Sequence, residues 1–262
     1  MKITIIGAGA MGGALAEGLL KAETIKPSDI TVANPHAGKL ARFTQMGAGI
    51  TTDNTVAVEG ADLVAIAVKP WLAEQVAREI APHLDYDHQM VLNLAANVKA
   101  EQLDRWLDRG DGRLPALFQV IPNIAIAVRA SMTFMVPCRA TEEQTAAVQA
   151  VFDELGQTCL TDEQHLAAGT MLASCGIAYA MRYFRAAAEG GVELGFKADA
   201  AKDIVLQTVK GAVELLQANG NHPEAEIDKV TTPGGLTIRG LNEMEHAGFT
   251  SAVIRGLKAG LR

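Results

Sequence analysis

Hydrophobic residues follow two different patterns along the chain, and the change between them falls near residue 161. Before it, short apolar runs rich in β-branched residues alternate with stretches whose apolar residues recur at helical spacing. The predicted strands cover residues 2–6, 29–35, 61–70, 89–96, 116–123 and 157–160, and the predicted helices cover residues 7–20, 39–47, about 73–80, the surroundings of Leu103 and Trp106, and 141–156. TEEQ at 141–144 predicts a capping box for the last of these helices. Regular alternation of strands and helices predicts an α/β fold with a doubly wound parallel sheet.

After residue 161 the strand pattern stops, and helices are predicted at 162–190, about 199–218 and after Gly235. The sequence therefore predicts two domains, an α/β domain over residues 1–161 and an all-α domain over residues 162–262. The sixteen residues from Leu166 to Met181 carry no charge, but a membrane-spanning helix needs roughly 20 apolar residues. We expect this helix to be buried in a core or a subunit interface, and we expect no membrane association.

Composition narrows the function without identifying it. The chain of 262 residues has a net charge of −7 and no basic stripe, so nucleic-acid binding is not expected. Cys138, Cys159 and Cys175 are too few and too irregularly spaced for a disulfide framework or a zinc site, and we expect no metal. Because Met1 is followed at once by a predicted strand rather than a signal peptide, we expect a cytoplasmic protein.

Glycines after the first strand carry the first chemical signal. Gly7, Gly9 and Gly12 form GxGxxG between a predicted strand and a predicted helix, the context in which this motif binds a dinucleotide. Gly7 permits the tight turn, Gly9 lets the backbone approach a pyrophosphate, and Gly12 lets helix and strand pack closely. The loop with Ala10 and Met11 is the predicted cofactor site of a Rossmann-type domain, because a helix N-terminus offers free N–H groups to an anion. The alternative is a tight turn with no ligand.

The end of the second strand indicates which dinucleotide is bound. NAD-specific enzymes commonly place a carboxylate there, whereas this chain has Asn34, followed by His36 and Lys39. Since a carboxylate would repel a 2′-phosphate and these residues would not, we expect NADP to be preferred, with NAD possible. A solvated loop without specificity is the alternative.

Three further strand ends are predicted to meet at the same edge of the sheet. They are marked by Lys69 and Pro70, by Ala95 after Asn93, and by Asn123 after Pro122. Ligands of open α/β sheets bind at the carboxyl ends of the strands, so Lys69 is interpreted as a cofactor contact rather than as the surface lysine of a turn.

A glycine-rich loop in the C-terminal region carries the second chemical signal. TTPGG at 231–235 cannot continue a helix, and TIRGLNEMEHAG resumes one. The amides of Gly234 and Gly235 suit a small carboxylate, and the hydroxyl of Thr232 or Thr237 suits a polar substrate atom. Taken alone, the same loop could be a simple helix N-cap.

TTPGGLTIRGLNEMEHAGF resembles the C-terminal signature of pyrroline-5-carboxylate reductases, and GAGAMG, AVKP, NLAA, VIPN and GIAYAMRYFRAAAEGGVELGF match that family in order and spacing. The resemblance covers nearly the whole chain. It implies a Rossmann domain followed by an all-α dimerisation domain, in a homodimer or larger homo-oligomer that reduces the cyclic imino acid 1-pyrroline-5-carboxylate to L-proline with NAD(P)H. It also implies that Thr232, Gly234 and Gly235 hold the substrate carboxylate, that Thr237 is the catalytic residue, bonded to the ring nitrogen, and that the cofactor-side contacts are Lys69, Pro70, Ala95 and Asn123.

The chain departs from the family pattern at three places, and these leave the exact imine open. It has IPNIAI where relatives commonly have MPNTPA, ASCGIAY where they have SGSGPAY, and AAN where they have AAG. Reduction of another cyclic imine is therefore an alternative. A β-hydroxyacid dehydrogenase is a weaker one, because Leu166–Met181 lacks the lysine those enzymes use, and a non-catalytic nucleotide sensor is the least favoured.

Overall fold

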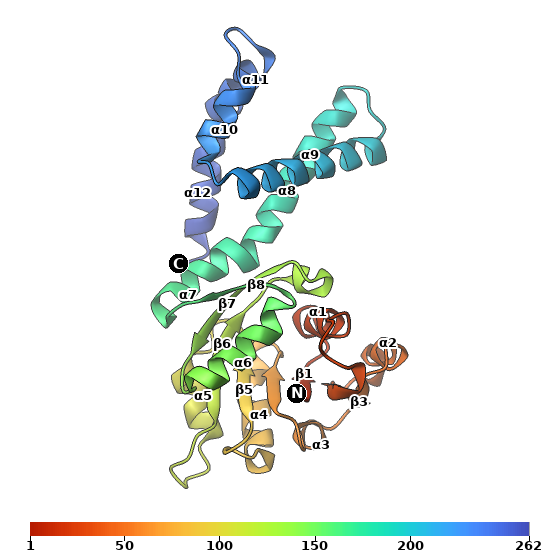
Figure 1. Cartoon of the computed structure of the whole chain (residues 1–262), viewed down its shortest axis with the longest axis vertical. Helices are drawn as coiled ribbons and strands as arrows, with labels where there is room; N and C mark the ends of the chain where they lie inside the picture. Colours follow the sequence, from red (N-terminus) through yellow and green to blue (C-terminus); the bar gives the residue numbers. More distant parts are fainter. Residues whose placement is uncertain (262) are drawn as a thin grey trace. The chain divides into compact units, whose positions relative to one another are not determined.

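The computed structural model describes residues 1–261 and divides into two compact units, Met1–Ser174 and Cys175–Arg262. The first unit is built on an eight-stranded sheet of order β3-β2-β1-β4-β5-β6-β7-β8 (Figure 1). The strands are β1 Ile3–Ile6, β2 Ile30–Ala33, β3 Gly49–Thr51, β4 Leu63–Ile66, β5 Met90–Asn93, β6 Ala116–Ile121, β7 Ser131–Pro137 and β8 Gly156–Leu160. The first six are parallel, in the order 3-2-1-4-5-6 of a dinucleotide-binding sheet, which confirms the predicted fold class.

Six of these strands were predicted, and two were not. β3 is only three residues long and mostly exposed, so it has no hydrophobic run to reveal it. β7 runs antiparallel to β6 and parallel to β8. Its inward positions include Ser131 and Thr133, which are buried and polar, so a search for apolar alternation misses the strand.

Helices cover both faces of the sheet, which makes it doubly wound (Figure 1). On β1, Ile3 and Ile5 point to one face and Ile6 to the other. The first face is covered by α1 Ala10–Leu19, α2 Ala41–Gln45 and α6 Glu142–Asp153, and the second by α3 Asn54–Val58, α4 Pro70–Ile80 and α5 Ala100–Leu107. Short 3-10 helices lie at η1 Pro27–Asp29, η2 Ala37–Lys39, η3 Ala81–His83 and η4 Ile124–Val128.

Local signals place several of these helix ends. α6 begins with the predicted capping box, in which Thr141 Oγ1 accepts from Gln144 N at 3.1 Å and Gln144 Oε1 accepts from Thr141 N at 2.9 Å. α4 begins at Pro70, three residues before the predicted start, because proline suits the first helical position.

The helical region is more divided than its pattern predicted. The expected helix 162–190 consists of α7 Glu163–Gly169, a π-helical segment Thr170–Cys175 and α8 Gly176–Glu193. The second unit continues with α9 Ala198–Asn219, α10 Pro223–Val230, α11 Leu236–His246 and α12 Phe249–Ala259. Pro223 is the first residue of α10, a helix that was not predicted. Gly248 adopts φ +84° and separates α11 from α12, which the sequence predicted as one helix.

The second unit leaves its apolar residues largely uncovered. Among its described residues only Ala201 is buried, although Tyr183 and Phe249 pack edge to face at 6.4 Å between ring centroids. Large apolar side chains exposed on this unit are Tyr179, Met181, Tyr183, Val192, Leu194, Phe196, Ile204, Leu206, Val213, Leu215, Val230, Leu236, Met244, Phe249, Val253, Ile254 and Leu261. No helix within residues 1–261 combines the length and the apolar character needed to cross a membrane.

Candidate functional site

Two glycines of the first loop are required by close backbone contacts. Gly7 is buried and has φ +108°, and a Cβ added there would lie 2.6 Å from the carbonyl oxygen of Ala67 on the neighbouring strand end. A Cβ at Gly12 would lie 1.9 Å from the carbonyl oxygen of Gly7. The turn out of β1 and the packing of α1 against it therefore exclude any larger residue at these two positions.

Gly9 differs from both, because it faces open space. It is exposed, and a Cβ added there would meet no heavy atom within 4 Å. It is also the N-cap of α1, and no side chain caps the helix. The first N–H groups of a helix have no partner within it, so the amides of Ala10, Met11 and Gly12 are available to an anion in front of Gly9.

Asn34 joins the glycine loop to the end of β2. Its side chain is only 7% exposed, its Oδ1 accepts from Ala8 N at 3.2 Å, and its Nδ2 donates to His36 O at 3.2 Å. Asn34 thus fixes the backbone at the point where the loop begins. Its predicted contact with a cofactor ribose stays a prediction.

A cavity of about 360 Å³ opens beside the loop and is lined by Ala8, Gly9, Ala10, Gly38, Lys39 and Arg42. Lys39 was predicted here, but Arg42 was missed. The available signal was its spacing, since residues three apart share a helix face. Both side chains are cationic, so the cavity joins a positively charged wall to the free amides of α1.

Arg42 is held in place by α1. Its Nη1 lies 2.6 Å from Glu17 Oε1, and a Cβ at Gly13 would lie 2.3 Å from Arg42 Nη2. Gly13 therefore leaves room for the guanidinium to cross α1 and reach Glu17. Both side chains remain partly exposed, so this ion pair is expected to be weak and exchangeable.

The remaining strand ends meet at the same edge of the sheet, as predicted from their positions. The parallel registers place Ile6, Ile66, Asn93 and Gln119 in one row across β1, β4, β5 and β6. The residues that follow this row therefore lie on one edge of the sheet.

Three of the four predicted contacts at this edge already have structural roles. Pro70 is the first residue of α4, Ala95 donates its N–H to Asn93 Oδ1 at 3.0 Å, and Asn123 caps η4 by accepting from Ala125 N at 2.9 Å. Lys69 is exposed and is the N-cap residue of α4. Direct contact of these four with a cofactor stays a prediction.

The C-terminal loop is a tight turn that ends in a helix. Gly235 N donates to Thr232 O at 2.8 Å, Pro233 is the second residue and Gly234 has φ +68°, which is the arrangement of a type II β-turn. A Cβ at Gly235 would lie 2.9 Å from the carbonyl oxygen of Thr232, which is backbone, so this position also favours glycine.

This geometry changes which amides are free. The N–H of Gly235, expected to hold a carboxylate, already closes the turn. The N–H groups of Leu236 and Thr237, the first two residues of α11, have no helical partner, and no side chain caps this helix. Within residues 1–261 the hydroxyls of Thr232 and Thr237 make no hydrogen bond, and both residues are exposed. Their roles toward a substrate stay predictions.

The free cysteines Cys138, Cys159 and Cys175 lie outside the glycine loop and outside the C-terminal turn. Burial raises the pKa of the Cys138 thiol to about 11, so it is protonated at neutral pH. The residue itself is only half-buried.

The regions of this chain that match known protein families include both the glycine loop after β1 and the C-terminal turn. Residues 2–97 match the model of a domain described as NADP oxidoreductase, coenzyme F420-dependent, and residues 163–262 match pyrroline-5-carboxylate reductase dimerisation. Pyrroline-5-carboxylate reductase 2 of Dictyostelium discoideum is 33% identical over 97% of this chain and 89% of its own length. This chain belongs to the pyrroline-5-carboxylate reductase family.

Other members of the pyrroline-5-carboxylate reductase family extend the comparison. Pyrroline-5-carboxylate reductase 1 of Dictyostelium discoideum is also 33% identical over 97% of this chain. This chain spans only 48% of the length of that protein. The pyrroline carboxylate reductase of Plasmodium falciparum, solved with NADP bound, superposes with a TM-score of 0.88, at 23% identity, over 99% of this chain and 95% of that one. The fold is therefore that of the pyrroline-5-carboxylate reductases from end to end, and the resemblance identified from the sequence motifs is confirmed.

Proposed function

We propose that this protein reduces the C=N bond of 1-pyrroline-5-carboxylate to L-proline with NADPH, the last step of proline biosynthesis. The proposal is carried by one observation. This chain, which matches the family over 97% of its length, has both an open glycine loop and an intact TTPGGLT turn. An NADPH-dependent reductase acting on a C=N bond would use the glycine loop to bind the cofactor and the TTPGGLT turn to bind the substrate. The three departures from the family pattern keep reduction of a related cyclic imine as the alternative.

The glycine loop fits the diphosphate of a dinucleotide. Space in front of Gly9, free amides at the start of α1 and the adjacent cavity are the features that such a group requires. Gly7, Gly9, Ala10, Met11 and Gly12 would hold the pyrophosphate. When bound, NADPH supplies the hydride.

The cavity also favours NADPH over NADH. Lys39 and Arg42 line it, and the end of β2 has the amide of Asn34 where a carboxylate would repel a 2′-phosphate. Arg42→Ala should therefore raise the KM for NADPH by roughly 10-fold, the equivalent of about 1.4 kcal/mol for one charge-assisted contact, and leave the KM for NADH unchanged. Equal effects on the two cofactors would contradict the assignment of Arg42 to the 2′-phosphate.

The C-terminal loop would hold the substrate. The turn at Thr232–Gly235 and the free first-turn amides of α11 suit a carboxylate, with Gly234 and the hydroxyl of Thr232 beside them. The hydroxyl of Thr237 would bond the ring nitrogen. A cyclic imine is basic enough to be partly protonated near neutral pH, so the ring nitrogen would already carry the proton that the amine product needs. The bond to Thr237 would orient the imine carbon toward the hydride, and orientation would supply most of the rate.

We also propose that the second unit forms a homodimer. A unit in which Ala201 is the only buried residue among those described has too little core to be stable alone, and its exposed apolar side chains need a partner. The match of residues 163–262 to a dimerisation domain supports a second copy as that partner. Residues 1–161 would then bind the cofactor, and residues 162–262 would bind the substrate and the partner. The three free cysteines are compatible with a cytoplasmic location, which belongs to the same proposal.

The decisive experiment is a steady-state assay with purified protein, a panel of cyclic imino acids and both cofactors. We expect NADPH oxidation with 1-pyrroline-5-carboxylate and stoichiometric formation of proline, measured by chromatography. Turnover with a different cyclic imine and none with this one would favour the alternative substrate. Oxidation of a β-hydroxyacid by NADP would refute imine reduction.

A further inference from the structure

Two buried amide side chains join the carboxyl end of β5 to the carboxyl-terminal half of β6. Asn93 and Gln119 are register partners on these strands and are 0% and 2% exposed. Asn93 Nδ2 donates to Gln119 Oε1 at 2.6 Å. Neither residue lies in the glycine loop or in the C-terminal turn.

Both amides also hold the loop that follows β5. Asn93 Oδ1 accepts from Ala95 N at 3.0 Å, and Asn93 Nδ2 donates to Val98 O at 3.0 Å. Gln119 Nε2 donates to the same carbonyl oxygen at 2.9 Å. The first and last residues of the segment 95–98 are thus fixed by side chains from two strands.

The segment is a turn that needs such support. Val98 N donates to Ala95 O at 3.4 Å, a long bond, and Asn97 has φ +61°, in the left-handed region that disfavours residues other than glycine. Ala95 and Val98 are buried while Asn97 is exposed. The conformation of the turn is therefore imposed by its anchors more than by its own sequence.

Both N–H donors of the Asn93 amide are used within the protein. Its two N–H groups bond Gln119 and Val98, and its oxygen bonds Ala95. Its oxygen keeps a second lone pair, but the residue is 0% exposed, so Asn93 does not reach a ligand from this position. Any effect on the reaction must pass through the backbone that it holds.

The position of the turn connects it to the reaction. In a sheet of order 3-2-1-4-5-6, the pyrophosphate lies at the start of α1, the adenosine lies toward β2, and the nicotinamide lies toward β4, β5 and β6. We propose that Asn93 and Gln119 are positioning residues that fix the turn 95–98 against the nicotinamide side of the cofactor site. This inference rests on the proposed function and adds to it the residues that set the geometry of hydride transfer.

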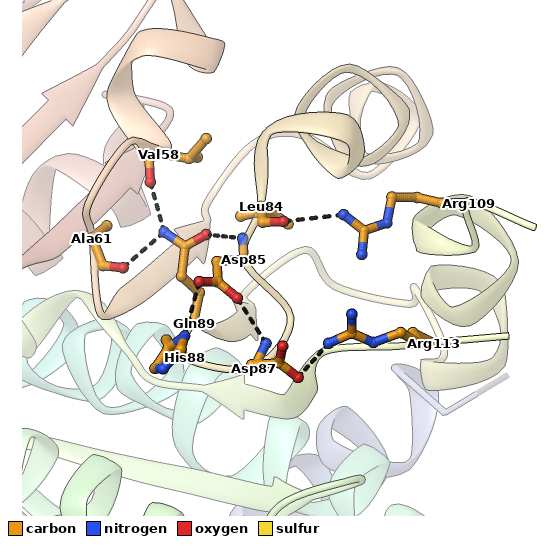
Figure 2. Close-up of polar contacts among 9 residues, drawn as sticks. All are labelled: Val58, Ala61, Leu84, Asp85, Asp87, His88, Gln89, Arg109 and Arg113. Carbon is orange, nitrogen blue, oxygen red and sulfur yellow. Dashed lines mark hydrogen bonds and ion pairs between the residues drawn. The ribbon is translucent and has the colours of Figure 1, made fainter. Parts of the chain in front are cut away.

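The other end of β5 supplies a matched control. Gln89 is 5% exposed, its Nε2 donates to Val58 O at 2.6 Å and to Ala61 O at 2.7 Å, and its Oε1 accepts from Asp85 N at 2.7 Å (Figure 2). Gln89 and Gln119 are thus two buried glutamines that anchor loops next to β5, at opposite edges of the sheet. Only Gln119 lies at the carboxyl edge.

The experiment compares Gln119→Met with Gln89→Met in the full-length protein. Methionine keeps the length of glutamine and removes its hydrogen bonds, so both variants should melt below wild type by comparable amounts. For Gln119→Met we expect kcat to fall roughly 10- to 100-fold, with the KM for NADPH changed less than about 3-fold, because misplacement near 1 Å has effects of this size on rate. The deuterium isotope effect with NADPH labelled at the transferred position should rise. Gln89→Met should retain wild-type kinetics per folded molecule.

Hydrogen exchange by mass spectrometry tests the structural part without turnover. Gln119→Met should lose amide protection in the peptide containing residues 95–98, and Gln89→Met should not. If Gln119→Met does not fold, Asn93→Ser replaces it, since serine can still accept from Ala95 N but cannot bridge Gln119 and Val98.

Unchanged kcat and unchanged exchange in the carboxyl-edge variant, or identical kinetic losses in both methionine variants, would overturn the inference. A wild-type protein that does not oxidise NADPH would refute the proposed function, while exchange would still decide whether Gln119 fixes the turn.

Discussion

The glycine loop allows one methyl group to be added at two positions with opposite consequences. In Gly12→Ala the new Cβ would lie 1.9 Å from the carbonyl oxygen of Gly7, which is backbone and cannot rotate away. In Gly9→Ala the new Cβ would meet nothing within 4 Å. The two variants are three residues apart and chemically identical, so each serves as the control for the other.

The size of each effect follows from this geometry. Ordinary van der Waals contact begins at 3.4 Å, so the turn or α1 must move by about 1.5 Å in Gly12→Ala. Overpacking of this kind costs about 1–3 kcal/mol or more, which lowers Tm by roughly 2–12 °C for a protein of this size. Gly9 has φ −76° and ψ −164°, which alanine adopts readily. The gain of about 0.4–1 kcal/mol from restricting the unfolded chain is offset by the poorer N-cap that alanine makes, so Gly9→Ala should change stability little.

The assay is thermal unfolding of both variants and wild type, with and without NADPH. A cofactor at 100 times its Kd stabilises the protein that binds it by about 2.7 kcal/mol. Wild type should show this shift, and Gly9→Ala should lose most of it, because the added methyl occupies the approach of the pyrophosphate. Gly9→Val, with a larger side chain, should abolish it.

Two results would refute this reasoning. If Gly9→Ala is destabilised as much as Gly12→Ala, the space in front of Gly9 is not open in solution. If Gly9→Val remains folded and binds NADPH with wild-type affinity, the pyrophosphate does not bind at this loop.

Three further predictions address the rest of the site and its supporting helices. Asn34→Asp keeps the acceptor for Ala8 N but adds a negative charge, so the KM for NADPH should rise relative to the KM for NADH in steady-state kinetics. If the ratio of the two KM values equals that of wild type, the cofactor assignment is contradicted. Thr237→Ala should lower kcat/KM by about 10- to 150-fold, the equivalent of one hydrogen bond to a charged group, and should leave the affinity for NADPH unchanged. Thr237→Ser should recover most of the lost kcat/KM. Equal kcat/KM for wild type and the alanine variant would show that Thr237 is only a helix-start residue. The hydrogen bond from Lys229 is the main reason that the pKa of Glu226 falls from 4.5 to about 2, so its contribution to stability should be present above about pH 4.5 and disappear as pH falls toward 2. Glu226→Gln should flatten this part of the acid unfolding profile measured by circular dichroism, and an unchanged profile would show that the carboxylate contributes nothing.

Several features of this protein were determined by the sequence alone, because each depends on residues that are neighbours in the chain. Gly7 and Gly12 predict a turn, in which contacts with carbonyl oxygens leave no room for a Cβ at either position. TEEQ predicts the capping box that starts α6. The parallel, doubly wound class of the cofactor half followed from regular alternation of strands and helices, although its strand order did not. The TPGG turn followed from the φ preferences of proline and glycine. Local backbone preference and hydrophobic periodicity are sufficient for such features.

Other features were decided only by the tertiary structure, because they join residues that are distant in the chain. Arg42 belongs to the cofactor cavity because α1 brings Glu17 and Gly13 to it. β7 runs antiparallel to β6 although its buried positions include Ser131 and Thr133. Their hydroxyls bond each other along the strand, so these positions do not follow an apolar pattern.

The network around Asn93 belongs to the same class. Its partner Gln119 lies 26 residues away on the next strand, and the hydrophobic periodicity of the sequence does not predict that the two side chains pair. Burial makes such a bond decisive, because an amide removed from water must find a partner inside the protein. Which partner it finds depends on strand register, and register is a property of the folded sheet.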